Sequence, residues 1–172
     1  MLICHSEYRE TGLDIRGGDC NDGGTATEQK EHYMWLKETL KKPADLKIVV
    51  GHVPIFSAGH HLDTKALVQD LLPLLQDNQV DMYLSGHDHT LQHLREKGEE
   101  RSTDFIISGG GGYVADPELL PNENLVKGLL VNGFVWVEIA RKRNGGPLTT
   151  HVDFVSLKKE DEAYSFERTY SV

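Results

Sequence analysis

The sequence contains little cysteine and no long apolar run. Cys4 and Cys20 are the only cysteines among its 172 residues. Two cysteines are too few for a disulfide framework, and their spacing is not that of a zinc site, so they can pair or stay free and leave the redox compartment open. No run approaches the roughly 20 apolar residues that cross a bilayer, and we therefore expect no membrane span.

The sequence also has fewer basic than acidic residues. Lysine and arginine total 18 against 27 acidic residues, which gives a formal net charge of −9. Surfaces that bind nucleic acid need clustered Lys and Arg, so we expect no nucleic-acid partner. A small phosphate substrate stays compatible with this charge, because a bound metal ion would dominate the local field. Residues 1–14 are too polar for a signal peptide, so localisation is unknown from this chain and any secretion signal would lie outside it.

What the sequence does contain is the alternating pattern of an α/β domain, and its length suits one core. Helical periodicity runs from a capping-box pattern at Thr25–Glu28 to Lys42. A short apolar strand at Leu46–Val50 is followed by a helix at about Asp63–Asp77, which a proline is expected to kink. A second strand at Val80–Leu84 completes a βαβ unit, so the two strands should be parallel.

The rest of the chain changes character. Asp104–Ile107 is a short predicted strand that leads into a run of four glycines. Segments of β type follow at Leu129–Ile139, Pro147–Leu157 and Ala163–Ser171. With no helix between them, these segments should be antiparallel. Pro117–Lys127 is the expected mobile loop, and Trp35 and Trp136 fit core positions.

Three of the nine histidines follow predicted strands. His52 comes directly after Gly51 at the end of the first strand of the βαβ unit, and His87 and His89 follow Gly86 at the end of the second. Ligands of open α/β sheets bind just beyond the carboxyl ends of parallel strands, so we expect His52 to lie near the other two. Neutral imidazole is a good ligand for zinc, iron and manganese-type centres. The pattern therefore predicts a metal site at this edge of the sheet.

The neighbouring polar residues are less specific. If extended geometry continues past the second strand, His87 and His89 face one side and Asp88 faces the other, where its carboxylate could orient an imidazole. His60 and His61 lie in the loop after the first strand. Without further information, a solvated loop pair is the simplest interpretation of these two residues.

Several segments resemble the purple (tartrate-resistant type) acid phosphatases of the calcineurin-like metallophosphoesterase superfamily. Val49–Ser57 (VVGHVPIFS) resembles a strand that ends in the Gly-His-x-Pro motif of that family. Ser85–Gln92 (SGHDHTLQ) resembles its Gly-His-x-His motif and the short strand that follows. Similar matches occur in the same order at Glu28–Leu40, Asp104–Gly112 and Gly133–Ile139. The resemblance covers nearly the whole chain and corresponds to the C-terminal part of such an enzyme.

The resemblance implies a mixed α/β (α+β) fold, the C-terminal half of an αββα sandwich. In it, a mixed sheet with the βαβ unit is followed by antiparallel strands. The implied activity is that of an acid phosphatase that hydrolyses phosphate monoesters, either small molecules or phosphoproteins. The implied cofactor is a binuclear centre of Fe(III) with Fe(II), Zn(II) or Mn(II). The family also suggests a secreted or lysosomal/vacuolar compartment.

The same resemblance assigns roles to individual residues. His52 and His87 correspond to ligands of the divalent metal, and His89 corresponds to a ligand of the ferric ion. His61 falls where the family has a loop histidine that contacts substrate or protonates the leaving group, and His60 is its close competitor. We therefore expect His61 to be catalytic and both His60 and His61 to bind substrate.

The resemblance leaves a gap at the start of the chain. The family also uses an Asp from a first Gly-Asp motif, a bridging Asp with a Tyr, and an Asn-His pair, and residues 1–24 contain no match to them. We therefore expect residues 1–172 to be a partial domain with an incomplete centre, inactive by itself. The open alternatives are a fragment of an acid phosphatase, an inactive short form that acts as a binding or regulatory module, and a related metallophosphodiesterase.

Overall fold

The computed structural model describes most of the chain beyond its first 25 residues. The described residues are 2–3, 6–9, 12–15, 26–98, 102–114, 117–141, 146–158 and 163–170, with side chains described from residue 30. Thr25 of the expected capping box, Cys4 and Cys20 lie outside these ranges.

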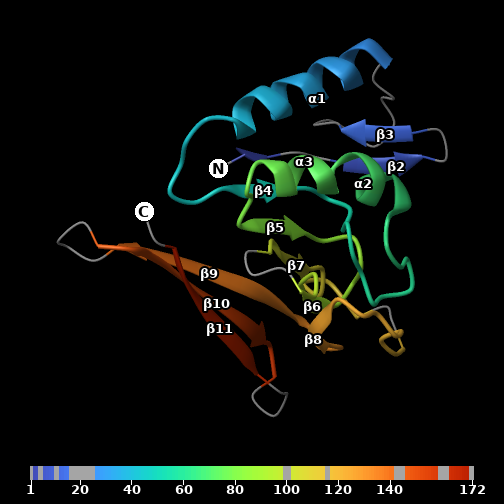
Figure 1. Cartoon of the computed structure of the whole chain (residues 1–172). Helices are drawn as coiled ribbons and strands as arrows, with labels where there is room; N and C mark the ends of the chain where they lie inside the picture. The colour runs from blue at the N-terminus through green and yellow to red at the C-terminus, as the bar shows by residue number, and fades with distance from the viewer. Residues whose placement is uncertain are drawn as a thin grey trace.

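A six-stranded mixed sheet forms the middle layer of the molecule (Figure 1). Its spatial order is β1 (Leu2–Ile3), β4 (Ile48–Val50), β5 (Met82–Ser85), β7 (Asp104–Ser108), β6 (Leu91–Leu94) and β8 (Leu125–Leu129). The first four are parallel, whereas β6 is antiparallel to β7 and β8. The predicted parallel pair, β4 and β5, is confirmed. A separate hairpin of β2 (Ser6–Arg9) and β3 (Gly12–Ile15) was not expected.

Helices cover one face of this sheet (Figure 1). They are α1 (Ala26–Leu40), α2 (Lys65–Asp70) and α3 (Leu72–Asp77). The single kinked helix expected at Asp63–Asp77 is instead two short helices. Leu71 ends α2, and Pro73, which has no N–H to donate and whose ring disfavours a continuous helix, lies in the first turn of α3. Within the described ranges, no helix is long and apolar enough to span a membrane.

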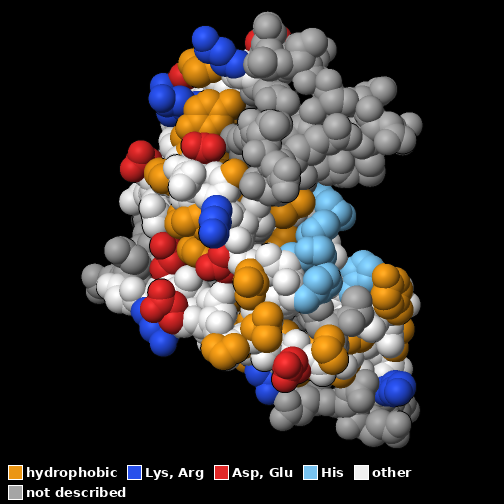
Figure 2. Space-filling model, turned by 90° about the vertical axis from the view of Figure 1, so that its right-hand side faces the viewer, with side chains coloured by type: hydrophobic (Ala, Val, Ile, Leu, Met, Phe, Trp, Pro, Cys, Tyr) orange, Lys and Arg blue, Asp and Glu red, His pale blue; other side chains and the backbone are white. Residues whose placement is uncertain are grey.

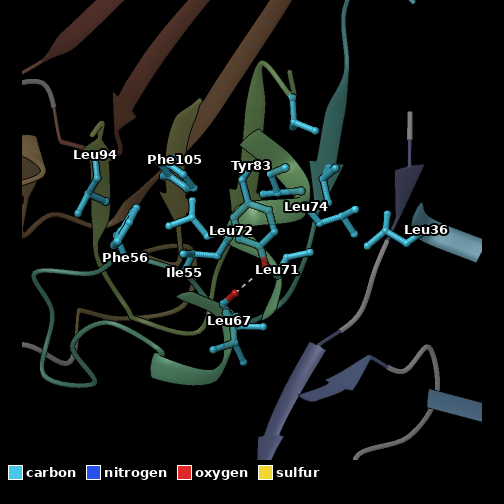
Figure 3. Packing of buried hydrophobic residues seen from close by; sticks show 14 of the residues in the cluster. Leu36, Ile55, Phe56, Leu67, Leu71, Leu72, Leu74, Tyr83, Leu94 and Phe105 are labelled. Carbon is cyan, nitrogen blue, oxygen red and sulfur yellow. Dashed lines mark hydrogen bonds between the residues drawn. The ribbon is translucent and has the colours of Figure 1, made fainter. Parts of the chain in front are cut away.

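The main core lies between the helices and the sheet. Leu36 and Leu40 of α1 are buried, and they join leucines of α2 and α3 in one cluster with Tyr83 and Phe105 of the sheet (Figure 3). Burying each leucine contributes about 1.5–3 kcal/mol relative to leaving it exposed. The Tyr83 hydroxyl donates to the Val53 carbonyl oxygen at 2.8 Å, so its polar end is satisfied inside the core.

A three-stranded antiparallel sheet forms the third layer. Its order is β11 (Tyr164–Tyr170), β10 (Leu148–Ser156) and β9 (Gly133–Arg141). The predicted antiparallel pairing of these segments is confirmed, except that the first strand begins at Gly133, because Leu129 ends β8 of the mixed sheet. Val152 and Phe154 of β10 pack with Met82 and Ile106 of the mixed sheet in a second core cluster. The layers are therefore helices, mixed sheet and antiparallel sheet (Figure 1).

A buried ion cluster joins the two sheets. Asp104 on β7 is fully buried, and its carboxylate accepts hydrogen bonds from Arg95 Nη2 at 2.5 Å and from Arg168 Nη1 at 2.6 Å. His93 Nε2 lies 2.9 Å from the same carboxylate, and His93 Nδ1 lies 2.8 Å from the Tyr164 hydroxyl. Burial acts to raise the pKa of Asp104, but His93, Arg168 and Arg95 outweigh it and hold this pKa below its usual value. Because Arg168 and Tyr164 belong to β11, the cluster fastens the third layer to the mixed sheet.

The outer face of the antiparallel sheet carries polar and aromatic side chains. His151 on β10 places Nε2 3.0 Å from Asp153 Oδ1 and Nδ1 3.2 Å from Glu167 Oε1. Partial burial acts to lower the pKa of His151, but the two carboxylates outweigh it and raise this pKa.

Two expectations about single segments are wrong or incomplete. The side chains of Trp35 and Trp136 are 47% and 57% exposed, so neither is a core residue. Trp136 faces outward because it alternates along β9 with valines that pack against the mixed sheet. The expected loop at Pro117–Lys127 is shorter, because β8 begins at Leu125 and pairs with β6.

Candidate metal centre

The parallel strands β4 and β5 position His52 and His87 side by side. Hydrogen bonds extend the β4–β5 pairing past both strands: Gly51 N donates to Leu84 O at 2.9 Å, and Gly86 N donates to His52 O at 3.0 Å. The rings of His52 and His87 therefore meet, with His52 Nε2 3.2 Å from His87 Nδ1. Their centroids lie 5.1 Å apart. The structure thus brings these two predicted residues together.

The chain turns sharply at His87. Its φ of 66° lies in the left-handed region that most side chains avoid. Asp88 N donates to Gly86 O at 2.8 Å, and Thr90 N donates to Asp88 O at 2.8 Å. The expected extended geometry of residues 87–89 is therefore wrong, because a tight turn redirects the chain from β5 into β6. Strained backbone of this kind persists only where the surroundings fix it, and it is common at functional sites.

A glycine at the end of β7 makes room for this turn. Gly109 N donates to Thr90 O at 3.0 Å. A Cβ on Gly109 would lie only 1.8 Å from the Asp88 carbonyl oxygen, so the two backbones can approach this closely only without a side chain. The shape of the histidine turn therefore depends on a residue that carries no functional group.

His89 has a different neighbour. Its ring packs edge-on against Tyr113, with centroids 4.4 Å apart and ring planes at 87°. His89 Nδ1 is buried and makes no hydrogen bond within the described part of the chain. Tyr113 was not predicted as a site residue. The available signal was the glycine run at residues 109–112, which lets the chain fold back so that the next side chain reaches His89.

The loop after β4 brings two more histidines to the same place. The centroid of the His61 ring lies 4.4 Å from that of His87 and 3.8 Å from that of His60. His61 Nε2 lies 3.8 Å from Asp88 Oδ1. Figure 2 shows histidine side chains gathered in one band on this face of the molecule. The loop pair is therefore part of the histidine cluster, which sequence periodicity alone did not indicate.

A buried serine holds the loop against the turn. The Ser57 hydroxyl donates a short hydrogen bond to Asp88 Oδ2 and accepts one from Gly59 N at 2.9 Å. Gln92 on β6 donates through Nε2 to Ser57 Oγ at 3.2 Å and accepts through Oε1 from Ala58 N at 2.8 Å. Ser57, Asp88 and Gln92 are fully buried. This network, which was not predicted, fixes the loop histidines relative to Asp88.

The electrostatics of the cluster favour a neutral ring at His87. Partial burial and the neighbouring His61 and His52 hold the pKa of His87 below its usual value, although Asp88 opposes this shift. A neutral imidazole keeps the lone pair that a metal ion requires.

The donor atoms fit a metal site in several respects. Two nitrogens on one ion, each about 2.0–2.1 Å from it, would lie roughly 3.3 Å apart, close to the 3.2 Å between His52 Nε2 and His87 Nδ1. Polar atoms that are buried without a hydrogen bond usually have a missing partner, and His89 Nδ1 is such an atom within the described residues. His60, His61 and Asp88 also offer ligand atoms that lie within 4.8 Å of one another.

Comparison with known proteins places these residues in a family. A family model described as calcineurin-like phosphoesterase matches residues 3–91. Purple acid phosphatase 17 of Arabidopsis thaliana is 52% identical over 96 residues, which are 54% of this chain and 28% of that protein. Tartrate-resistant acid phosphatase type 5 of Sus scrofa is 36% identical over 118 residues, 63% of this chain and 34% of that protein. The match thus spans about a third or less of the length of these curated relatives.

Solved structures agree on the architecture. GAP50, the anchor in the inner membrane complex of Plasmodium, superposes with a TM-score of 0.74 at 28% identity, over 88% of this chain and 46% of that chain. A purple acid phosphatase from yellow lupin seeds gives a TM-score of 0.62 at 16% identity, over 96% of this chain and 32% of that one. The second likeness shows the fold alone. The predicted fold class, a mixed sheet followed by an antiparallel sheet, is confirmed.

Proposed function

This chain belongs to the calcineurin-like phosphoesterase family, and we propose that it supplies the histidine side of the metal centre of an acid phosphatase. The proposed reaction is the hydrolysis of phosphate monoesters, either small molecules or phosphoproteins. The proposed centre is binuclear, with Fe(III) beside Fe(II), Zn(II) or Mn(II). A secreted or lysosomal/vacuolar location belongs to the same proposal. Its support comes from the purple acid phosphatase relatives and from the geometry of the histidines.

The observation that carries the proposal is the convergence of His52 and His87. Their ring nitrogens meet at 3.2 Å at the carboxyl ends of two parallel strands, where open α/β sheets bind ligands. We assign these two rings to one ion and the His89 ring to the other. When bound, the metal pair would polarise the phosphate and lower the pKa of water so that hydroxide can attack.

The remaining residues act on the substrate and on the rings. His61 lies 4.4 Å from the His87 ring by centroids, near enough to hold a proton beside the departing oxygen of the substrate. His60 lies next to it and can contact the same substrate. Asp88, anchored by Ser57, faces His61 Nε2 at a distance of 3.8 Å.

Binding of Mn²⁺ by the purified chain tests the metal assignment. His52→Ala should weaken binding at least about tenfold, since even outer partners of metal ligands matter by 10–100-fold. His32→Ala, a half-buried histidine on α1, is the control and should bind like the parent. Equal Mn²⁺ affinity of the His52→Ala variant and the parent would refute the assignment. Activity is tested on the longest protein that the gene encodes. If that protein shows no metal-dependent hydrolysis of p-nitrophenyl phosphate, it is no phosphatase.

A non-catalytic role is the second candidate. It is favoured by the likeness to GAP50, which is described as an anchor and which matches 88% of this chain at 28% identity. In that case, the histidine cluster would persist as part of the fold while the protein serves as a binding or regulatory module. Metal binding without any hydrolysis by the longest gene product would support this role over the first.

A further inference from the structure

We propose that His60, His61 and Asp88 form a separate cation site that is best suited to Zn²⁺. An ion bound there would regulate the metal centre, because it would coordinate His61, the histidine that faces the leaving group. The binding claim concerns this chain alone. The regulatory consequence rests on the proposed function, because an ion held by His61 would leave that ring unable to deliver a proton.

The spacing of the donor atoms matches such an ion. One ligand atom from each of the three residues lies within 4.8 Å of the other two, and His61 Nε2 lies 3.8 Å from Asp88 Oδ1. Two ligands of a tetrahedral Zn²⁺, each about 2.0–2.1 Å from the metal, lie roughly 3.3 Å apart. His61 and Asp88 therefore need to approach each other by about half an ångström, and the pairs that include His60 by at most about 1.5 Å. Two imidazoles and one carboxylate are a donor set that zinc uses, with a fourth position open to water.

Asp88 provides the independent observation. Its side chain is fully buried, and Ser57 occupies Oδ2. The other oxygen, Oδ1, is buried and accepts no hydrogen bond within the described part of the chain, although it faces the ring of His61. A buried carboxylate oxygen without a partner is costly, so such atoms usually mark an ion or a water that completes them. A cation between Asp88 and the two imidazoles would satisfy it.

Rigidity on one side and access on the other favour binding. Asp88 is fixed by Ser57 and by the turn at His87, so the carboxylate is already in place. His60 and His61 are exposed, and their rings stack with centroids 3.8 Å apart, so an ion from solvent can reach both. Only the two side chains in the loop need to adjust, which keeps the ordering cost of binding low.

Cobalt spectroscopy on the whole 172-residue chain tests the site without any need for activity. His52 and His89 are first replaced together by alanine to remove the centre already proposed. This double variant should still bind one Co²⁺, with the intense visible bands of four-coordinate cobalt, and Zn²⁺ should displace the ion. Adding His60→Ala or Asp88→Asn should weaken Co²⁺ binding at least about tenfold, whereas adding His32→Ala should not. Circular dichroism verifies that each variant is folded. Because His60 is exposed, His60→Ala should remain folded and test the site even if the Asp88→Asn variant unfolds.

The outcomes separate this site from the proposed phosphatase. If the double variant binds no cobalt, or if His60→Ala leaves the affinity unchanged in a folded chain, the additional site does not exist, whatever the activity. If the site binds and the longest gene product is an active phosphatase, excess Zn²⁺ should inhibit it. His60→Ala should then raise the inhibitory zinc concentration about tenfold relative to its own uninhibited rate. Inhibition at the same zinc concentration in both proteins would overturn the regulatory role.

Discussion

Replacing Asp104 by asparagine removes the negative charge at the centre of the cluster that joins the two sheets. In the native chain, the carboxylate accepts hydrogen bonds from Arg95 and Arg168 and lies 2.9 Å from His93 Nε2. An amide has one acceptor oxygen and one NH₂ donor. Whichever way the amide turns, its NH₂ group faces a guanidinium donor, and two half-buried arginines lose their counter-ion.

The size of the effect follows from this geometry. Hydrogen bonds to charged groups contribute about 1.5–3 kcal/mol each. Removing one partner of a buried ion pair costs about 3–5 kcal/mol, because the other charge stays buried and uncompensated. We therefore expect Asp104→Asn to lower the free energy of unfolding by about 3–5 kcal/mol. With a urea m-value of about 2 kcal/mol per molar, the midpoint should fall by roughly 2 M.

Urea titration followed by circular dichroism is the assay, because the exposed Trp35 and Trp136 are poor reporters of the core. Asp153→Asn is the control, a half-exposed carboxylate whose loss should cost less than about 1 kcal/mol.

The folded pKa of Asp104 is lowered, so its stabilisation is present above the unfolded pKa near 3.9 and is lost as the pH falls through the lower folded value. The difference in the free energy of unfolding between the parent and Asp104→Asn should thus persist from pH 7 to 5 and shrink only in stronger acid. A change below about 1 kcal/mol at pH 7 would refute this account of the cluster.

Three further predictions concern single residues. Gly109→Ala should lose about 1–3 kcal/mol of stability or more in thermal melts, since the new Cβ would clash with backbone beside the histidine turn. Gly112→Ala is the control and should leave the stability unchanged, because a Cβ there meets nothing within 4 Å. Leu36→Ala should cost about 2–5 kcal/mol in urea titrations because it empties a fully buried position, and an equal loss from exposed Met34→Ala would contradict this. The raised pKa of His151 means that its stabilisation is complete below the unfolded pKa near 6.5 and is lost as pH rises through the folded value. The Tm difference between the parent and His151→Ala should therefore narrow from pH 6 to 8, and a constant difference would exclude the linkage.

The parts of the fold that sequence predicted are those with a local signature. The apolar runs that end at Gly51 and Gly86 were identified as parallel strands because a helix of suitable length separates them. That topology alone placed His52 beside His87, since parallel strands end at the same edge of a sheet. The antiparallel strands were predicted because no helix separates the segments, and the pairing of β9, β10 and β11 bears this out.

The parts that escaped prediction depend on contacts between distant residues. Nothing near Ser57 indicates that its hydroxyl meets Asp88, 31 positions further along the chain. The left-handed backbone of His87 has no signature, because a histidine rarely adopts this conformation and only the packed turn imposes it. Trp136 was placed in the core by residue type, yet the strand period that sets its direction depends on which face of β9 meets the mixed sheet.

The anchoring of the loop that carries the histidines constrains how this protein can change. Surface loops normally tolerate insertions and deletions. In the segment from Ser57 to Asp63, however, consecutive backbone amides are bound to fixed partners: Ser57 N donates to Asp63 Oδ1 at 2.9 Å and Ala58 N donates to Gln92 Oε1 at 2.8 Å. One added or deleted residue would shift every later amide off its acceptor and carry His60 and His61 away from Asp88. The length of this loop is therefore as restricted as its composition, and changes to the histidine cluster are better directed to side chains around the loop than to the number of residues within it.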